Sequence, residues 1–377
     1  MIERLKFLFS LVFFYQKKKT QIVAFIKTDN IGDYILFRNF LPYTRKSPKY
    51  ASHRLVLIGN SAWKELAESM DKEYIDVFFW INTALYAQNK WYRIKILWAL
   101  RKMNVEILIN TVHSRNWIVN ELVDFTNAAN KISCEGDDIN LGTKIKEESD
   151  KRFNFILPSL PTSVFEFERN QFFFEKLLEQ SINLQRPFFK IPKIQKQNHC
   201  ISLFIGAQSA LRRWSLDYFA ELILAIHKDY PDYYFQILGS PNDYENGEKI
   251  ISSLEKVDLA LIINNLCGQT SLIDLINRIG ESHLLISNET SGVHIAAAVE
   301  TQTVCIANGE RFGRFSPYPV QISNCINTIF PDESFYFEEN HKDYTHKFQY
   351  KSTIDINSIT PEVVLPTIFS ILKNDNN

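Results

Sequence analysis

The chain has 377 residues, of which 45% are hydrophobic and 23% charged. This is the composition of a globular protein and excludes a disordered chain, and the length suits two domains of ordinary size. The formal net charge of -1 excludes an overall positive field that would attract nucleic acid, so any anion site must come from a local arrangement of residues.

The N-terminal segment, residues 1–20, combines an apolar run at 7–15 with three lysines at 17–19. The run is too short for a transmembrane helix, which needs about 20 residues. No small-residue cleavage site follows it, which argues against a signal peptide. Two interpretations stay open, a helix lying on an anionic membrane surface and a first helix packed on the protein's own core.

The first half of the chain then alternates short apolar runs with longer stretches compatible with helices. Such runs predict strands that are buried on both faces, as in a parallel sheet. The predicted strands are 22–26, 55–58, 77–80, 105–109 and 155–157. Residues 187–198 contain two prolines and several polar side chains, which predicts a linker.

The second half repeats this rhythm. Its predicted strands are 200–205, 233–238, 259–263, 284–286 and 303–307, with helices at 218–227 and 271–279. Ser271 and Asp274 form a capping-box pattern at the start of the last helix. The predicted fold class is α/β, with two Rossmann-like doubly wound domains facing a central cleft. The predicted divisions are 1–20, 21–190, 199–360, and a C-terminal helix and tail at 361–377.

The five cysteines are scattered, without a CxxC pair or a close histidine. This spacing argues against a zinc site, and their odd number argues against a secreted disulfide framework. A reducing cytoplasm fits best, and no metal ligand is assigned. The pattern GxGxxG and the P-loop pattern are also absent, so neither a standard dinucleotide site nor a P-loop site is supported.

Three segments at predicted strand ends carry candidate chemistry. The first, residues 27–33 (KTDNIGD), follows the opening strand. Gly32 would allow a sharp turn there and would place Asp33 at a helix start facing the cleft. A carboxylate in that position can accept a proton as a general base. An aspartate that caps a helix explains the same position more simply when this segment is considered alone.

The second segment, residues 206–214 (GAQSALRRW), follows the first strand of the second half. Gly206 begins a loop in which Arg212 and its neighbour Arg213 can make bidentate phosphate contacts. Trp214 is predicted to brace this loop against the helix that begins near Ser215. Solvated surface arginines are the competing interpretation.

The third segment, residues 287–298 (SNETSGVHIAAA), predicts a strand, a polar turn and an alanine-rich helix. Free backbone N–H groups and the helix dipole favour a diphosphate at such a turn. Thr290 and Ser291 add hydroxyl donors, and His294 in the first turn can donate to a phosphate oxygen. A histidine at a helix start is more often structural, but its place in this polar turn favours the phosphate role.

These three segments, in this order, resemble glycosyltransferase family 9, the lipopolysaccharide heptosyltransferases. The family pattern has Gly-Asp after the first strand, a Gly-Ala loop followed by Lys-x-Trp, and Asp-Thr-Gly-x-x-His-x-Ala-Ala near the end. Residues 266–272 (LCGQTSL) and 107–115 (ILINTVHSR) are similar to further, weaker family segments. The likeness covers most of residues 20–320. It implies the GT-B fold, an acceptor domain at 21–190 and a donor domain at 199–360.

The resemblance also implies roles for individual residues. Asp33 is the implied general base of an inverting transfer. The implied donor-binding residues are Gly206, Arg212, Asp243, Glu245, Glu289, Thr290, Ser291, Gly292 and His294, with Asp243 and Glu245 as alternatives for the ribose. The weaker acceptor-site candidates are His113 and Arg115. No metal and no cofactor is implied, because arginine and a helix N-terminus can stabilise the leaving diphosphate.

The sequence departs from the family pattern at three of these positions. Arg212 stands in place of lysine, Glu289 in place of the motif aspartate, and Ser291 in place of the first glycine, with Gly292 one position later. Charge type survives at both ionic positions, so nucleotide binding is still expected, in a pocket of altered size. Arg311 and Arg314, in a loop that also departs from the family, either touch the donor sugar, close the cleft or are solvated.

The expected activity is transfer of heptose or a related sugar, from a nucleotide diphosphate donor that the family suggests is ADP-linked, to a lipopolysaccharide core or other surface glycan. The expected partners are this donor and a lipid-linked glycan acceptor, with no nucleic acid. The expected location is the cytoplasm, at the inner membrane if the N-terminal segment binds it. A nucleotide-sugar 2-epimerase of the same architecture and a non-catalytic nucleotide-binding relative are the alternatives.

Overall fold

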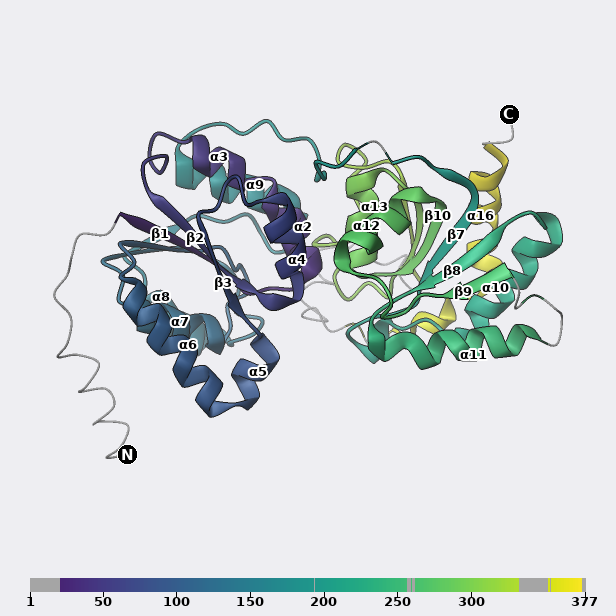
Figure 1. The fold of residues 1–377 in the computed structure, drawn as a ribbon, viewed down its shortest axis with the longest axis horizontal. Coiled ribbons are helices and arrows are strands. Elements are labelled where there is room, and N and C mark those ends of the chain that lie inside the picture. Colours follow the sequence, from purple (N-terminus) through teal and green to yellow (C-terminus); the bar gives the residue numbers. More distant parts are fainter. Residues whose placement is uncertain are drawn as a thin grey trace.

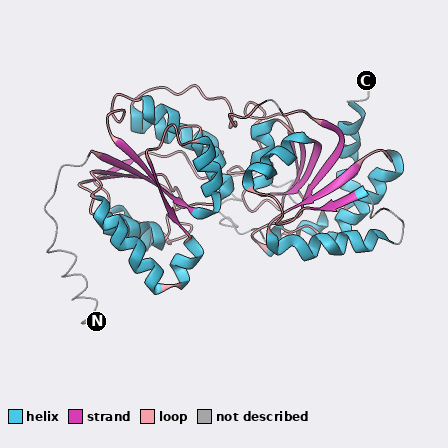
Figure 2. Ribbon diagram, viewed as in Figure 1, coloured by secondary structure: helices cyan, strands magenta, loops and turns pink. Residues whose placement is uncertain are grey.

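The computed structural model describes residues 21–192, 194–255, 259, 262–331, 352 and 354–374. Within these residues the chain forms two parallel β-sheets, each with helices on both faces (Figures 1 and 2). This arrangement confirms the predicted α/β class with two doubly wound halves. The helix considered for residues 1–20 lies outside the described residues.

The first sheet has six parallel strands in the order β3-β2-β1-β4-β5-β6. They are β1 (Ile22–Lys27), β2 (Arg54–Asn60), β3 (Val77–Ile81), β4 (Ile107–Asn110), β5 (Asn130–Cys134) and β6 (Phe155–Leu157). Strand β5 was not predicted, because its residues NKISC mix polar and apolar side chains and its first residues are exposed or only half-buried.

Helices cover both faces of this sheet. On one face lie α2 (Ile31–Arg38), α3 (Leu41–Lys46), α4 (Lys64–Met70), which follows the short helix η1 (Ser61–Trp63), and α9 (Glu166–Leu178). On the other face lie α5 (Thr83–Gln88), α6 (Lys90–Met103), α7 (Trp117–Thr126) and α8 (Thr143–Asp150). Helix α2 is anchored by Arg38, whose guanidinium makes two hydrogen bonds of 3.0 and 2.8 Å to the buried carboxylate of Asp71.

The second sheet is also six-stranded and parallel, in the order β12-β11-β10-β7-β8-β9. Its strands are β7 (Gln197–Phe204), β8 (Tyr234–Leu238), β9 (Ile263–Asn265), β10 (Ser282–Asn288), β11 (Gln302–Ile306) and β12 (Ile326–Ile329). Three expectations need correction. Strand β7 begins inside the predicted linker, β9 begins where the predicted run 259–263 ends, and the half-buried β12 (INTI) was not predicted.

The helices of the second sheet divide in the same way between its faces. One face carries α10 (Leu216–Asp229), α11 (Tyr244–Leu254) and the C-terminal α16 (Pro361–Asn374), and the other carries α12 (Leu272–Glu281) and α13 (Ser291–Val299). Short helices η2 (Ala210–Arg212), η3 (Pro241–Asp243) and η7 (Ile356–Ser358) complete the set. The predicted capping box at Ser271 and Asp274 is confirmed, and it begins α12.

The two halves pack on each other through α2 and α13. One continuous apolar cluster includes Phe37 of α2 and Val293 of α13, so the interface between the halves is part of the main core. Polar contacts add to it, since the Leu272 backbone N–H donates to the Glu65 carboxylate at 2.9 Å. Among the described helices, none is long and apolar enough to cross a bilayer.

Candidate active site

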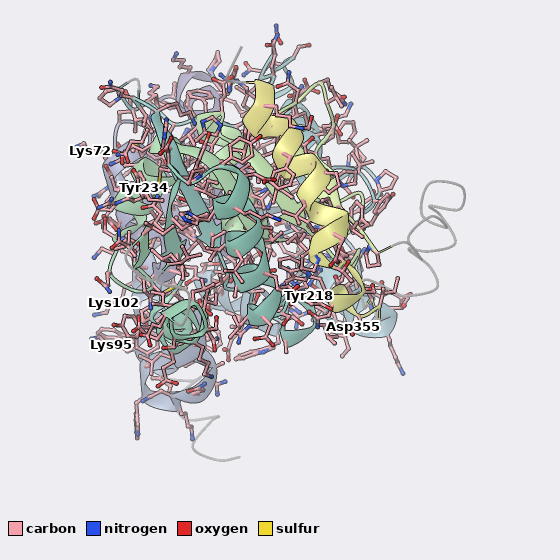
Figure 3. The ribbon with its side chains drawn as sticks, turned by 90° about the vertical axis from the view of Figure 1, so that its right-hand side faces the viewer. Lys72, Lys95, Lys102, Tyr218, Tyr234 and Asp355 are labelled. Atoms are coloured by element: carbon pink, nitrogen blue, oxygen red, sulfur yellow. The ribbon has the colours of Figure 1, made fainter. Side chains whose placement is uncertain are left out.

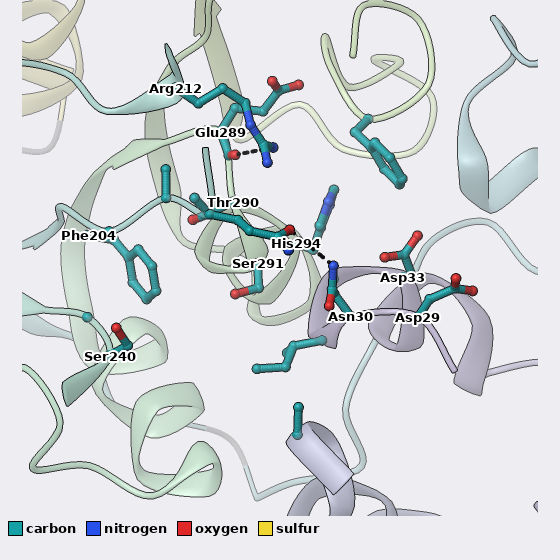
Figure 4. A pocket seen from close by; sticks show the side chains of 18 of the residues that line it. Asp29, Asn30, Asp33, Phe204, Arg212, Ser240, Glu289, Thr290, Ser291 and His294 are labelled. Carbon is teal, nitrogen blue, oxygen red and sulfur yellow. Dashed lines mark hydrogen bonds between the residues drawn. The ribbon is translucent and has the colours of Figure 1, made fainter. Parts of the chain in front are cut away.

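A cleft of about 1180 Å³ lies between the two halves, at the carboxyl ends of their strands. The loops after β1 and β7 and the N-terminus of α13 line it. Figure 4 shows Asp29 and Asp33 on the first half, across the cleft from Arg212, Glu289 and Thr290 on the second. The three segments singled out from the sequence therefore meet at one cavity, as open α/β sheets lead one to expect.

Asp33 lines this cleft from the first turn of α2 and is partly exposed to it. It is the third residue of the helix, whose N-cap is Asn30. The simpler interpretation, in which Asp33 caps the helix, is therefore wrong. The side chain of Asn30 instead reaches across the cleft and donates to the Gln208 side chain at 3.3 Å.

Gly32 does not form the predicted sharp turn, because it lies within α2. Because it has no side chain, Gly32 allows the two halves to approach closely. A Cβ atom at this position would lie 2.7 Å from Cδ2 of His294, closer than real side-chain contacts allow. Glycine thus lets α2 and α13 approach until Asp33 and His294 line the same cavity.

Two buried side chains fix the loop between β1 and α2. Lys27 is fully buried at the end of β1, and its ammonium forms an ion pair with Asp29 at 2.8 Å. From the short helix η1, which follows β2, the indole N–H of Trp63 donates to the Asp29 carbonyl at 3.0 Å. A Cβ at Gly59 would lie 2.2 Å from the Trp63 ring and overlap it. The glycine near the end of β2 therefore makes room for this indole.

These surroundings make Asp33 a better base than an ordinary carboxylate. Burial raises the pKa of Asp33 to about 6, the nearby negative charge of Asp29 acts in the same direction, and Lys27 opposes them. Bases are most effective when their pKa lies near the working pH. Asp33 is therefore ionised at neutral pH, yet accepts a proton more readily than an exposed aspartate.

Arg212 lines the cleft at the end of η2. Its Nη1 donates to the Glu289 carbonyl at 3.4 Å, and its Nε forms an ion pair with Glu310 at 3.3 Å. Its side chain remains 15% exposed, so the guanidinium has donors to spare for an anion in the cavity. The predicted brace is also present, because the buried Trp214 packs edge-on against Phe219 of α10.

Glu289 is buried at the end of β10 and also lines the cleft. One carboxylate oxygen accepts a hydrogen bond from the Ser316 hydroxyl, and the other has no hydrogen-bond partner among the described residues. Burial raises the pKa of Glu289, although Ser316 and Arg212 oppose that effect. The unpaired oxygen is thus available to a hydroxyl group in the cavity.

The N-terminus of α13 points into the cavity as predicted. Thr290 is the N-cap, and its hydroxyl accepts from the Gly292 N–H at 3.4 Å. The N–H of Ser291, the first helical residue, has no acceptor within the helix. Thr290 and Ser291 line the cleft, but Gly292 does not. That glycine instead packs against Phe204, 3.0 Å from where its Cβ would stand.

His294 lines the cleft from the first turns of α13. Its Nδ1 lies 2.5 Å from the Tyr318 hydroxyl. Burial lowers the pKa of His294 to about 4, against a weaker opposing effect of Glu166, so the ring is neutral at neutral pH. In the tautomer in which Nδ1 accepts from the Tyr318 hydroxyl, the proton lies on Nε2 and the neutral ring can donate to an anion.

The ribose candidates separate in the structure. Asp243 lines the cleft and ends η3, where its carboxylate accepts from the Ser240 N–H at 2.9 Å. It also packs behind Gly206, whose Cβ would lie 2.5 Å from the carboxylate. Glu245 lies two residues further on, exposed at the start of α11 and outside the cavity lining. Of the two alternatives, the cavity selects Asp243.

The acceptor-side candidates His113 and Arg115 do not line the cleft. Arg115 is fully buried and donates to the Ser133 hydroxyl at 2.8 Å. His113 is buried beside Asp137 at 3.5 Å, and burial, with Arg169 acting in the same direction, lowers its pKa to about 2. Ser114, which lies between them, faces the cavity instead.

Arg314 bridges the two halves at the edge of the cleft, a role the sequence left among three alternatives. Its Nε donates to the Glu166 carboxylate at 3.0 Å and its Nη1 to the Ser114 hydroxyl at 2.7 Å. The Glu166 backbone N–H returns a hydrogen bond to the Arg314 carbonyl at 2.8 Å. Burial disfavours ionised Glu166, but the guanidiniums of Arg169 and Arg314 outweigh it and hold its pKa below the ordinary value.

The described residues contain no group of three or more His, Cys, Asp or Glu side chains placed to hold a metal ion.

Two Rossmann-like halves that face a central cleft define the GT-B class, and solved structures share this fold. E. coli ADP-heptose lipopolysaccharide heptosyltransferase II is 15% identical, covers 94% of this chain and 99% of its own, and has a TM-score of 0.63. The family 9 glycosyl transferase of Veillonella parvula is 15% identical, over 94% and 97%, with a TM-score of 0.68. An E. coli heptosyltransferase solved with ADP is 12% identical, over 93% and 99%, with a TM-score of 0.67.

Within this class, residues 168–344 match the sequence model of glycosyltransferase family 9 (heptosyltransferase), which confirms the predicted resemblance. Lipopolysaccharide heptosyltransferase 2 of Salmonella typhimurium is 26% identical over 164 residues, which are 44% of this chain and 44% of that protein. The alignment therefore spans less than half of the relative's length.

Proposed function

We propose that this chain is an inverting glycosyltransferase that moves heptose or a related sugar from an ADP-linked donor to a lipopolysaccharide core or related lipid-linked glycan. The observation that carries the proposal is the placement of Asp33 across one cleft from Arg212 and the N-terminus of α13. A base and an anion site that face each other are what this transfer needs. A location at the cytoplasmic face of the inner membrane belongs to the same proposal.

In the proposed reaction the acceptor hydroxyl oxygen attacks the anomeric carbon of the donor sugar. The new C–O bond forms as the bond to the diphosphate oxygen breaks, and the diphosphate leaves with the bonding electrons. Asp33 takes the proton of the attacking hydroxyl. Arg212, the Ser291 N–H and His294 hold the leaving diphosphate, so we propose that neither a metal ion nor another cofactor takes part.

The donor class can be tested directly by mixing the protein with ADP-heptose, with and without a lipopolysaccharide acceptor lacking the terminal heptose. The proposal expects a glycosylated acceptor and ADP only when both substrates are present, and at most slow donor hydrolysis without acceptor. A new nucleotide sugar formed without acceptor would identify an epimerase instead. Thermal-shift measurements with ADP, GDP, UDP and CMP establish which base the cavity accepts, and ADP is expected to raise the melting temperature most.

The pH dependence of the reaction should reveal the raised pKa of Asp33. The base works only when ionised, so kcat/KM is expected to fall as the pH drops through about 6, by about tenfold for each further pH unit. Far-UV circular dichroism over the same range checks that the fold is intact. A profile that stays flat down to about pH 4.5 would rule out a base with this raised pKa.

Arg212→Ala is expected to weaken ADP binding by roughly tenfold to a hundredfold, the range for losing hydrogen bonds to a charged group. Arg212→Lys should restore part of the affinity, because it keeps the charge but loses the bidentate geometry. Titration calorimetry measures both. Arg186→Ala is the matched control, since Arg186 pairs with Glu300 outside the cavity lining and should bind ADP normally. Equal affinity in Arg212→Ala would remove this residue from the anion site.

A further inference from the structure

Helix α6 exposes an unusual stripe of side chains to solvent. Trp91, Lys95, Trp98 and Lys102 are all exposed, and Trp91 retains 80% and Trp98 47% of its accessible surface. Their spacing of four, three and four residues places them on one face of the helix. The opposite face, with Ile96, Leu97 and Leu100, is buried in the core.

The surroundings of this stripe are basic. Residues 77–105 contain five Lys or Arg residues and no Asp or Glu, although the whole chain has a formal net charge of -1. The Lys102 ammonium lies 3.2 Å from the centre of the Trp98 ring, and Lys95 forms no ion pair with any described residue. Figure 3 shows Lys95 and Lys102 at the same outer edge of the molecule.

The two helices that neighbour α6 in the sequence, α5 and α7, reach the cleft. Thr83 and Ala84, in the first turn of the preceding helix α5, line the cavity, and Leu85 next to them is 40% exposed. Trp117 at the start of α7 is 45% exposed and lies between two residues that line the cavity. Exposed apolar side chains therefore occur on α6 and also next to the cavity lining, on α5 and α7.

We propose that the solvent face of α6, defined by Trp91, Lys95, Trp98 and Lys102, is a docking surface for an anionic phospholipid bilayer. Tryptophan side chains favour the headgroup region of a bilayer. There the apolar part of the indole ring contacts the acyl chains, and its N–H group reaches water or the lipid headgroups. Lysines beside them are attracted by the negative surface potential of anionic lipids, and their stems lie along the apolar layer. Exposed tryptophan rings interleaved with lysines fit a surface that is both apolar and negatively charged, and an anionic bilayer offers both.

This inference rests on the proposed function in one respect. The lipid-linked acceptor explains why docking would be useful, because a protein bound through α6 is held at the membrane that carries the acceptor. It differs from the membrane contact considered for residues 1–20, because it uses a separate element of the acceptor half. Vesicle binding needs neither donor nor acceptor. Its failure and the failure of the proposed reaction are therefore distinguishable.

The test is co-sedimentation of the full chain with vesicles of phosphatidylethanolamine and phosphatidylglycerol, and with vesicles of phosphatidylcholine alone. Wild type is expected to bind the anionic vesicles and to be released by salt. Trp91→Ala/Trp98→Ala and Lys95→Glu/Lys102→Glu should each lose at least about tenfold in partitioning. Lys72→Glu/Lys249→Glu reverses two exposed lysines elsewhere and is expected to bind like wild type.

Unchanged melting temperature and unchanged ADP binding in the α6 variants would show that fold and donor site are intact. Three results would overturn the proposal. The first is a wild type that does not bind anionic vesicles, and the second is α6 variants that bind as wild type does. The third is self-association that depends on Trp91 and Trp98, which would make this face an interface between copies of the chain.

Discussion

Asp33→Asn is expected to lower turnover by roughly a hundredfold or more while donor binding stays near the wild-type value. The amide has the size and polarity of the carboxylate but cannot take the proton of the attacking hydroxyl. Asp33 lies in the first turn of α2, and no hydrogen bond or ion pair among the described residues joins it to Arg212 or to the N-terminus of α13, so the substitution leaves the anion site intact. Steady-state kinetics measure turnover, and calorimetry with ADP measures binding.

Asp29→Asn is the matched control, because it changes the same chemical group in the same cleft. Asp29 already forms an ion pair with Lys27, so it should not serve as the base, and a loss of turnover below about tenfold is expected. Its negative charge raises the pKa of Asp33, so the acid limb of the pH profile should move to lower pH in this variant. A larger loss in Asp29→Asn than in Asp33→Asn would reverse the assignment of the base.

Arg314→Ala is expected to lower the free energy of unfolding by roughly 1.5 to 3 kcal/mol, the range for losing a hydrogen bond to a charged group, because Glu166 keeps its ion pair with Arg169. The substitution takes the guanidinium away from buried Glu166 and leaves the Ser114 hydroxyl without its donor. Both partners belong to the first half and Arg314 to the second, so the contact that holds the halves together weakens as well. Urea unfolding followed by tryptophan fluorescence measures the change.

Arg311→Ala provides the comparison within the same loop. Arg311 also lines the cleft but is 29% exposed, and its nearest described carboxylate, Glu310, lies 3.9 Å away. A partly exposed pair separated by this distance is expected to contribute about 1 kcal/mol or less. If both substitutions destabilise the protein equally, the bridge from Arg314 to Glu166 contributes little. A double-mutant cycle with Glu166→Gln then gives the coupling energy of the pair.

Much of the site was predictable because strand-end segments in parallel sheets converge on one edge. Asp33, Arg212 and Thr290 each follow a recognisable apolar strand within a few residues, and the structure brings all three to one cavity. The loop after β4 was harder to assign. Residues 113–115 lie outside the strand, where side chains follow no regular alternation, so the local sequence does not show that Ser114 faces the cavity while His113 and Arg115 are buried.

The contacts between the halves were the least predictable part. Glu166 and Arg314 are 148 positions apart, and no local pattern marks Glu166 as more than a charge at a helix start. Gly32 was singled out for the wrong reason. A glycine near a strand end predicts a turn, but Gly32 lies within α2. Only the approach of α13 shows that the missing side chain makes room for His294.

The central claim is that a nucleoside diphosphate binds between the N-terminus of α13 and Asp33. A crystal structure with ADP tests it most directly. The diphosphate is expected within about 3 Å of the Ser291 N–H and the Arg212 guanidinium, the distance of a charge-assisted hydrogen bond, with its open end towards Asp33. ADP bound on another face, or a cleft left empty at saturating ADP, would contradict it.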